Sequence, residues 1–140
     1  MTILSPMPPP RTSSLDSESL RHQVFGRHVY VAGPYRAATE EARLENVQRA
    51  CRLSLRLLRL GGIPVCVHPT IHLGGYGRDE DEEERRMGIR TTLLTATLVR
   101  DSGGLCAALC LPDGSLSEGT RGEVALFKPS CVFTFLHDEV

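Results

Sequence analysis

Residues 28–35 read HVYVAGPY and place a short apolar run directly before a Gly-Pro pair. The run Val29–Val31 is β-branched and aromatic, which favours a strand. Gly33-Pro34 ends this strand, because glycine and proline interrupt regular structure. A long segment with helical periodicity begins a few residues later, and a strand followed by a helix is typical of an α/β unit.

That segment, from about Thr39 to Leu60, predicts one amphipathic helix. Its apolar stripe, at spacings of three and four residues, consists of Leu44, Val47, Cys51, Leu55 and Leu58. Thr39 is a candidate N-cap followed by two acids that suit the positive end of the helix dipole, and Gly61-Gly62 is expected to end the helix. We interpret the arginines off the stripe as a solvated basic face rather than a phosphate-binding surface: Arg49, Arg52, Arg56 and Arg59.

Strands and helices continue to alternate along the chain. Further runs of strand length are IPVCV at 63–67, GLCAALCLP at 104–112 and CVFTFL at 131–136. The acidic run at 74–86 is expected to begin a helix that continues through MGIRTTLLTATLV, although its threonines also suit a strand. GTRGEVALF predicts a short helix. The pattern predicts an α/β fold with a doubly wound parallel sheet of about five strands, covered on both faces.

The composition indicates one ordinary globular domain. The chain has 140 residues, of which 41% are hydrophobic and 24% charged, a size and balance that suit a single core. A net charge of −1 argues against a nucleic-acid polymer or a membrane surface as the partner. No apolar stretch reaches the ~20 residues of a membrane span. We expect a flexible N-terminal arm over residues 1–26, which are rich in proline, serine and charge, and the domain over 27–140.

The five cysteines indicate the compartment. Their number is odd, they form no Cys-x-x-Cys pair and three of them lie in apolar runs, so we expect buried free thiols in a reducing environment. The apolar run at the N-terminus is too short for the core of a signal peptide. The sequence therefore predicts a cytoplasmic protein, either of a host cell or encoded by a phage.

Ligands of such sheets bind beyond the carboxyl ends of the strands. The candidate residues therefore lie at 33–35, 68–72 and 113–120, and Tyr35 is expected to point its hydroxyl into this crevice beside Gly33 and Pro34. The two histidines of HPTIH, His68 and His72, could form half of a zinc site, but no third ligand stands at a suitable spacing. We expect no metal and assign both histidines to the pocket wall or its loop. The absence of GxxxxGK[ST] and GxGxxG motifs argues against NTPases and dinucleotide-binding proteins.

Residues 117–127, SEGTRGEVALF, bring hydroxyls, glycines and an acid to the start of a predicted helix. Ser117 and Thr120 carry the hydroxyls, Gly119 permits close approach of a ligand, and the helix start favours an anion such as phosphate. Glu123 follows on the same side as Thr120. In the alternative interpretation, Ser117 is only a cap and Glu123 only complements the helix dipole. A phenol and a carboxylate at one edge of the sheet favour a binding site.

The segments VYVAGPY, GGIPVCVHP, EERRMGI with its Glu-Arg pair, and SEGTRGEVALF together resemble the nucleoside 2-deoxyribosyltransferase-like superfamily. The resemblance extends from about His28 to Leu136 and implies a flavodoxin-like fold that cleaves or exchanges the N-glycosidic bond of nucleosides or nucleotides without a cofactor. Glu123 matches the catalytic glutamate nucleophile, and Tyr35 lies where relatives place a substrate-contacting group, which would orient Glu123. At an ordinary pKa near ~4.3 this carboxyl would be ionised at neutral pH without special help.

Two positions refine what the resemblance implies. Nucleoside transferases tend to carry an aspartate six residues before the glutamate; this chain has Ser117 there, as nucleoside 5′-monophosphate N-glycosidases do. A serine hydroxyl can accept a phosphate neighbour that a carboxylate would repel. Relatives also carry an acid in the helix before the central strand. Here no acid lies between Arg90 and Val99, so Asp101 or His72 is left to protonate the departing base.

The sequence thus predicts an N-glycosidase, or a base-exchanging transferase, that acts on a small nucleotide or nucleoside and forms a homodimer. The base and the choice between ribose and deoxyribose stay open. The alternative is a non-catalytic nucleotide-binding sensor or regulatory module on the same fold. A third interpretation is an interaction domain that docks through its arginine face.

Overall fold

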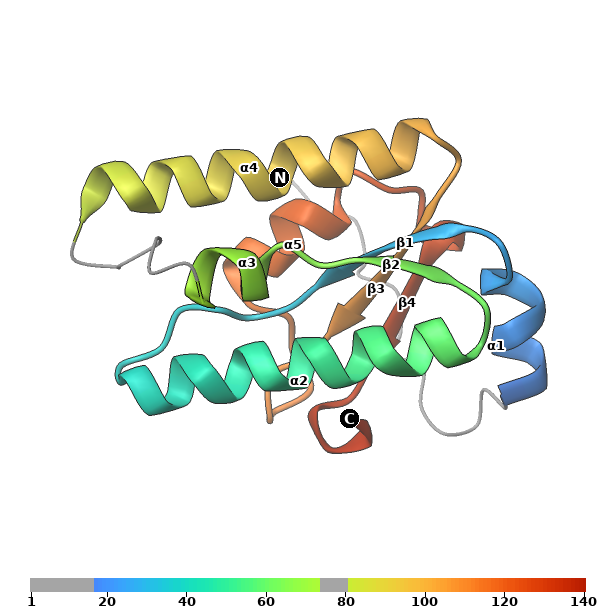
Figure 1. Cartoon of the computed structure of the whole chain (residues 1–140), viewed down its shortest axis with the longest axis horizontal. Helices are drawn as coiled ribbons and strands as arrows, with labels where there is room; N and C mark the ends of the chain where they lie inside the picture. The colour runs from blue at the N-terminus through green and yellow to red at the C-terminus, as the bar shows by residue number, and fades with distance from the viewer. Residues whose placement is uncertain (1–16, 74–80) are drawn as a thin grey trace, which may run out of the picture.

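The computed structural model describes residues 17–73 and 81–140 (Figure 1). Residues 1–16 of the expected N-terminal arm and residues 74–80 at the start of the acidic run lie outside the described residues. The end of that arm forms the helix α1 (Ser17–Val24). Its side chains Leu20 and Val24 are fully buried in the core, so this part of the arm belongs to the packed domain.

The described residues contain one parallel sheet of four strands, with the spatial order β2-β1-β3-β4. The strands are β1 (His28–Ala32), β2 (Ile63–Val65), β3 (Leu105–Leu109) and β4 (Val132–Phe135). From β1 the chain moves outward to β2 and then returns to add β3 and β4 on the other side. This reversal of direction defines a doubly wound, flavodoxin-like fold.

The expected number of about five strands was wrong by one, because only the four runs of strand length named above form strands. The threonine-rich segment after residue 90 belongs to a helix, as expected. This helix, α4 (Glu82–Asp101), begins at the N-cap Asp81, whose carboxylate accepts hydrogen bonds from the amides of Glu83 and Glu84 at 3.1 Å each. Several of its threonines donate their hydroxyl hydrogen to a carbonyl one turn earlier, as Thr95 does to Thr91 at 2.7 Å. The β-branched side chains are therefore accommodated within the helix.

The helix α2 (Glu40–Arg59) starts where the sequence predicted, since Thr39 Oγ1 accepts a hydrogen bond from the amide of Ala42 at 3.1 Å. Its predicted apolar stripe was confirmed at Val47 and wrong at the other four positions. The residues buried against the sheet are Val47, Ala50, Leu53 and Leu57, whereas Leu44, Leu55 and Leu58 are 39%, 44% and 57% exposed. Leucines occur on both sides of this helix, so periodicity alone did not identify the inner face.

The arginines of α2 are not simply a solvated face. Arg49 donates a hydrogen bond to the carbonyl oxygen of His137 at 2.7 Å, and the guanidinium of Arg56 lies 5.3 Å from the ring centroid of Phe135, a cation–π contact. Two of the four predicted surface arginines therefore hold the C-terminal segment, which includes the short 3₁₀ helix η2 (His137–Glu139).

Helices cover both faces of the sheet, with α2 on one side and α4 on the other (Figure 1). Side chains alternate along β1, so that Val29 and Val31 pack with α1 and α2, while Tyr30 and Ala32 face α4 and the short helix α5 (Glu118–Val124). The remaining short elements are α3 (His68–Leu73) and the 3₁₀ helix η1 (Pro129–Cys131).

All five cysteines are free thiols. Cys106 and Cys110 are buried, as expected for thiols in apolar runs, but Cys51 is exposed and Cys66 and Cys131 are half-buried. Among the described helices, none combines the length and apolar content that crossing a membrane requires.

Candidate active site

A cavity of about 740 Å³ lies at the carboxyl edge of the sheet, within the range of roughly 300–1,000 Å³ typical of small-molecule sites. Its walls come from the loop after β1, from α3, from the first half of α4 and from the segment that leads into α5. Eight of the ten predicted site residues line it: Gly33, Pro34, Tyr35, His68, Ser117, Gly119, Thr120 and Glu123. The sequence therefore located the cavity, because parallel strands bring their carboxyl ends to one edge.

Glu123 is a buried acid, only 6% exposed, and its Oε1 atom has no hydrogen-bond partner among the described residues. Burial raises the pKa of this carboxyl to about 7, and the hydroxyls of Thr92 and Tyr30 lower it by less than burial raises it. The expectation of an ordinary carboxyl, fully ionised at neutral pH, was wrong, because burial penalises the charged form.

Tyr30 lies beneath the cavity and was missed as a site residue. It is fully buried on β1, its ring stacks on Phe127 with centroids 6.5 Å apart, and its hydroxyl has no hydrogen-bond partner among the described residues. Burial, followed by the charge of Glu123, raises the pKa of this phenol well above its ordinary range. The signal was its alternation with Val29 and Val31, which directs it to the opposite face of the sheet.

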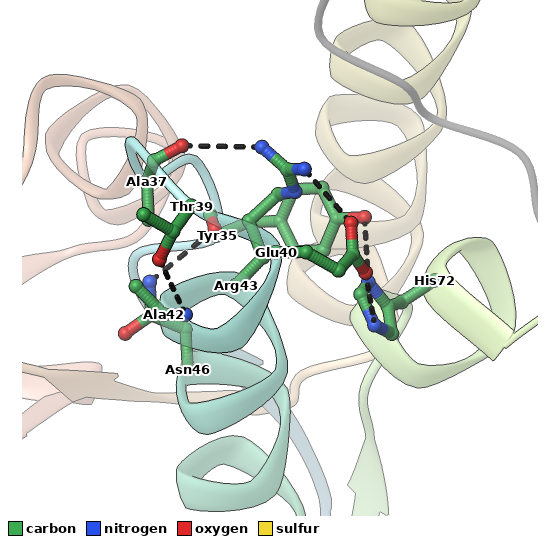
Figure 2. A network of polar contacts seen from close by, with 8 residues as sticks. All are labelled: Tyr35, Ala37, Thr39, Glu40, Ala42, Arg43, Asn46 and His72. Carbon is green, nitrogen blue, oxygen red and sulfur yellow. Dashed lines mark hydrogen bonds and ion pairs between the residues drawn. The ribbon is translucent and has the colours of Figure 1, made fainter.

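Tyr35 lines the cavity, but its hydroxyl hydrogen-bonds to His72 Nδ1 at 3.1 Å (Figure 2). Its ring lies between two imidazoles, 5.5 Å from the centroid of His68 and 5.8 Å from that of His72. The proposed partner of Tyr35 was Glu123. In the structure the two residues both line the cavity, and His72, with which the phenol forms a hydrogen bond, is not part of that lining.

The two histidines of HPTIH have different surroundings. His68 lines the cavity, is 6% exposed, and has a buried Nδ1 without a hydrogen-bond partner among the described residues. Burial lowers the pKa of His68 to about 4, so its imidazole is neutral at neutral pH. His72 is not part of the cavity lining; its Nε2 lies 3.2 Å from Glu40 Oε1.

Ser117 caps α5, as the more conservative interpretation expected. Its Oγ accepts a hydrogen bond from the amide of Thr120 at 3.3 Å and lies 2.7 Å from the hydroxyl of Thr120. Both residues also line the cavity, so the cap and the candidate ligand contact are the same group. A Cβ atom added to Gly119 would have no heavy atom within 4 Å, so at this position the cavity wall is bare backbone.

The acid expected from the second helix is not Asp101. This residue is exposed at the last position of α4, where it pairs with Arg100 at 2.8 Å, and it lies outside the cavity lining. Because α4 leads into the amino end of β3, Asp101 lies at the opposite edge of the sheet from Glu123.

A different acid on α4 reaches the cavity. Glu84, Gly88 and Thr92 all line it, and their spacing of four residues places them on one face of the helix. Glu84 is only 9% exposed. Glu84 belongs to the Glu-Arg stretch EERRMGI, but an acid was expected only between Arg90 and Val99, so this residue was missed.

The cavity carries both signs of charge. Arg36 and Arg85 contribute to its lining together with the acids Glu84, Glu118 and Glu123. Within residues 17–73 and 81–140, no group of three or more His, Cys, Asp or Glu side chains could hold a metal ion. The arrangement can bind an anion at its basic side chains and supply carboxyl chemistry beside it.

No family model matches the chain, and neither a curated protein nor a solved structure matches it. Fold and site therefore define the class: a flavodoxin-like α/β protein with a ligand-sized cavity at the carboxyl edge of its sheet. Glu123, the buried acid in that cavity, is the residue whose surroundings are most typical of a functional site.

Proposed function

We propose that this protein cleaves the N-glycosidic bond of a nucleoside 5′-monophosphate, or exchanges its base, with Glu123 as the nucleophile. One observation carries the proposal: a buried carboxyl with an unpartnered oxygen faces a cavity large enough for a nucleotide. The resemblance of AGPY and SEGTRGE to the nucleoside 2-deoxyribosyltransferase-like superfamily supports the same assignment.

The proposed reaction begins with ionised Glu123. A carboxylate oxygen forms a bond to C1′ while the C1′–N bond breaks, and the bonding electron pair leaves with the base. The departing base takes up one proton, for which Glu84 is the donor we propose. Water then attacks C1′ of the ester, and the bond to Glu123 breaks. One hydrogen of the water stays on the new hydroxyl group, and the other is transferred as a proton to Glu84, which returns to its protonated form. In the transferase variant, a second base replaces the water.

The charges of the cavity suit a phosphorylated substrate. Arg36 and Arg85 would attract the phosphate group, and the hydroxyls of Ser117 and Thr120 would hydrogen-bond to it. Neutral His68 would meet an uncharged part of the substrate. The hydroxyls of Thr92 and Tyr30 lower the pKa of Glu123 and so help the carboxylate form needed for attack.

The alternative of a non-catalytic nucleotide-binding module is favoured by the same carboxyl. A pKa of about 7 leaves about half of Glu123 protonated at neutral pH, which weakens it as a nucleophile in the empty cavity. A bound substrate that develops positive charge at C1′ would favour the ionised form, and a regulatory ligand would not need to.

We further propose that the protein acts in the cytoplasm as a homodimer. The helix α4 supports a second copy as the partner, because Leu94 and Leu98 on its surface are 54% and 71% exposed and lie four residues apart on one face. Ile89, on the same helix, is 49% exposed and also lines the cavity.

The experiment is a chromatographic screen for free base released from ribo- and deoxyribonucleosides and their 5′-monophosphates. We expect release from at least one monophosphate, and a fall of at least ~10³-fold in Glu123→Gln, which keeps the shape but lacks the attacking charge. Mass spectrometry of rapidly quenched reactions should show a sugar-phosphate adduct on the peptide containing Glu123. Monophosphate binding without base release would favour the regulatory module.

A further inference from the structure

Three side chains, of which only Tyr35 lines the cavity, form a chain of polar contacts (Figure 2). The Tyr35 hydroxyl lies 3.1 Å from His72 Nδ1, and His72 Nε2 lies 3.2 Å from Glu40 Oε1. The other oxygen of Glu40 accepts a hydrogen bond from Arg43 at 2.8 Å. The chain starts at a residue of the cavity lining and ends at a surface ion pair.

The chemistry of the three groups determines where the hydrogen atoms lie. Arg43 lowers the pKa of the Glu40 carboxyl, so Glu40 is ionised at neutral pH and can only accept. The ionised carboxylate 3.2 Å from Nε2 favours the tautomer of His72 that carries its hydrogen on Nε2. In the neutral imidazole the other nitrogen, Nδ1, is an acceptor, and the Tyr35 hydroxyl has to donate to it.

Two residues of α2, the helix that carries Glu40, form hydrogen bonds with the backbone around Tyr35. Asn46 donates a hydrogen bond to the carbonyl oxygen of Tyr35 at 3.3 Å, and Arg43 donates one to that of Ala37 at 3.2 Å. With the ring placed between His68 and His72, several independent contacts set the position of the Tyr35 side chain, a residue of the cavity lining.

We infer that Glu40 and His72 are positioning residues that hold the Tyr35 hydroxyl as a hydrogen-bond acceptor for the ligand. The phenol has a single hydrogen, which is committed to His72, so any ligand group that bonds to this oxygen must itself donate. A sugar hydroxyl can do so. The dianion of a phosphate monoester cannot, because all three of its terminal oxygens are acceptors.

This assignment orients the ligand. Resting on the proposed function, it places a sugar hydroxyl of the nucleotide against Tyr35. It directs the phosphate away from Tyr35, toward the hydroxyls of Ser117 and Thr120 on the segment that follows β3. The chain of polar contacts itself does not depend on the identity of the ligand.

The tautomer of His72 can be observed directly. Long-range ¹H–¹⁵N correlation spectra of the full chain, labelled with ¹⁵N-histidine, distinguish the two imidazole tautomers, and His72→Gln identifies the His72 signals. We expect the Nε2–H form at neutral pH. Glu40→Ala should produce a mixture of tautomers, whereas Glu40→Gln, whose amide oxygen accepts the same hydrogen, should preserve the single form.

The matched control is Glu45→Ala, which removes the same charge from the same helix at a residue that pairs with Arg49. It should leave the His72 signals unchanged. An Nδ1–H or doubly protonated His72 at neutral pH would overturn the inference. Insensitivity of the tautomer to Glu40→Ala would do the same.

The orientation has its own test, with ribose 5-phosphate and inorganic phosphate as probes in calorimetric titrations. Tyr35→Phe should weaken ribose 5-phosphate about three- to tenfold, the value of one neutral hydrogen bond, and leave inorganic phosphate unchanged. Equal weakening of both probes would place the phosphate against Tyr35 and overturn the orientation. If neither probe binds, the proposed function and the orientation both fail, while the spectra still test whether Glu40 sets the tautomer of His72.

Discussion

The Tyr30 hydroxyl and the Glu123 carboxyl shift each other's pKa values. The phenol lowers the pKa of the carboxyl, and the carboxylate charge raises the pKa of the phenol. Yet Tyr30 Oη and Glu123 Oε1 complete no hydrogen bond within the described part of the chain. The pair therefore stabilises the ionised acid only in part, and the cost of burying Glu123 remains in the empty protein.

Glu123→Gln should change the pH dependence of stability. The folded-state pKa of about 7 exceeds the ordinary value of 4.5, so between these values the folded chain binds more protons than the unfolded chain and loses stability as pH rises. Gln does not titrate. The variant should therefore gain on the parent protein by up to about 3 kcal/mol from acidic pH to about pH 8, measured by urea unfolding across this range.

The control for this change is Glu118→Gln, which removes an exposed acid from the first turn of the same helix. Its stability should follow the parent protein at every pH within about 0.5 kcal/mol. A Glu123→Gln profile that runs parallel to the parent would show that Glu123 titrates as an ordinary surface acid.

Glu84→Gln tests the acid that sequence reasoning missed. If Glu84 protonates the departing base, base release should fall by about 10²- to 10⁴-fold, the usual contribution of a general acid. Monophosphate binding, measured by calorimetry, should persist. Glu83→Gln is the matched control, because the neighbouring acid is exposed and outside the cavity lining. Equal rates in the two variants would remove Glu84 from the mechanism.

Local patterns predicted much of the fold. The strand before Gly33-Pro34 and the N-cap at Thr39 depend on neighbouring residues, and both could be read from a few positions. The buried face of α2 could not, because leucines occur on both sides and tertiary contacts choose between them. The contacts of Arg49 and Arg56 could not be predicted from local patterns either, because their partners His137 and Phe135 lie far along the chain.

Some residues of the candidate site could likewise be predicted from local patterns, and others could not. Tyr35, Ser117 and Glu123 could be assigned to one cavity because each follows a strand whose carboxyl end is at the same edge. Glu84 lines the cavity because α4 packs across the sheet. The local sequence does not indicate which turn of that helix lies at the cavity. The raised pKa of Glu123 results from burial, which several distant segments create together.

Gly119 and Gly122 provide a pair of substitutions with equal local effects. Both lie in α5 with open space where a Cβ would be, and only Gly119 lines the cavity. Alanine at either position should stabilise the helix by about 0.5–1 kcal/mol. Gly119→Ala should weaken monophosphate binding, because the methyl group occupies part of the cavity wall, whereas Gly122→Ala should not. Equal affinities in calorimetry would place the ligand away from α5.

Ser117→Asp tests why this chain would prefer a phosphorylated ligand. Aspartate is as good an N-cap as serine, so α5 should keep its start and the melting temperature should change little. The new carboxylate would face the phosphate at the position of the Ser117 hydroxyl, and repulsion of more than about 1.4 kcal/mol corresponds to at least a tenfold loss of affinity.

The loss should be confined to the phosphate form. Titration calorimetry of one nucleoside and its 5′-monophosphate should show a weaker monophosphate and an unchanged nucleoside in Ser117→Asp. Ser117→Asn has the shape of aspartate and its capping ability without the charge, and it should bind the monophosphate nearly as the parent does. If Asp and Asn weaken the monophosphate equally, the effect is steric, and the phosphate lies closer to Arg36 and Arg85 than to the start of α5.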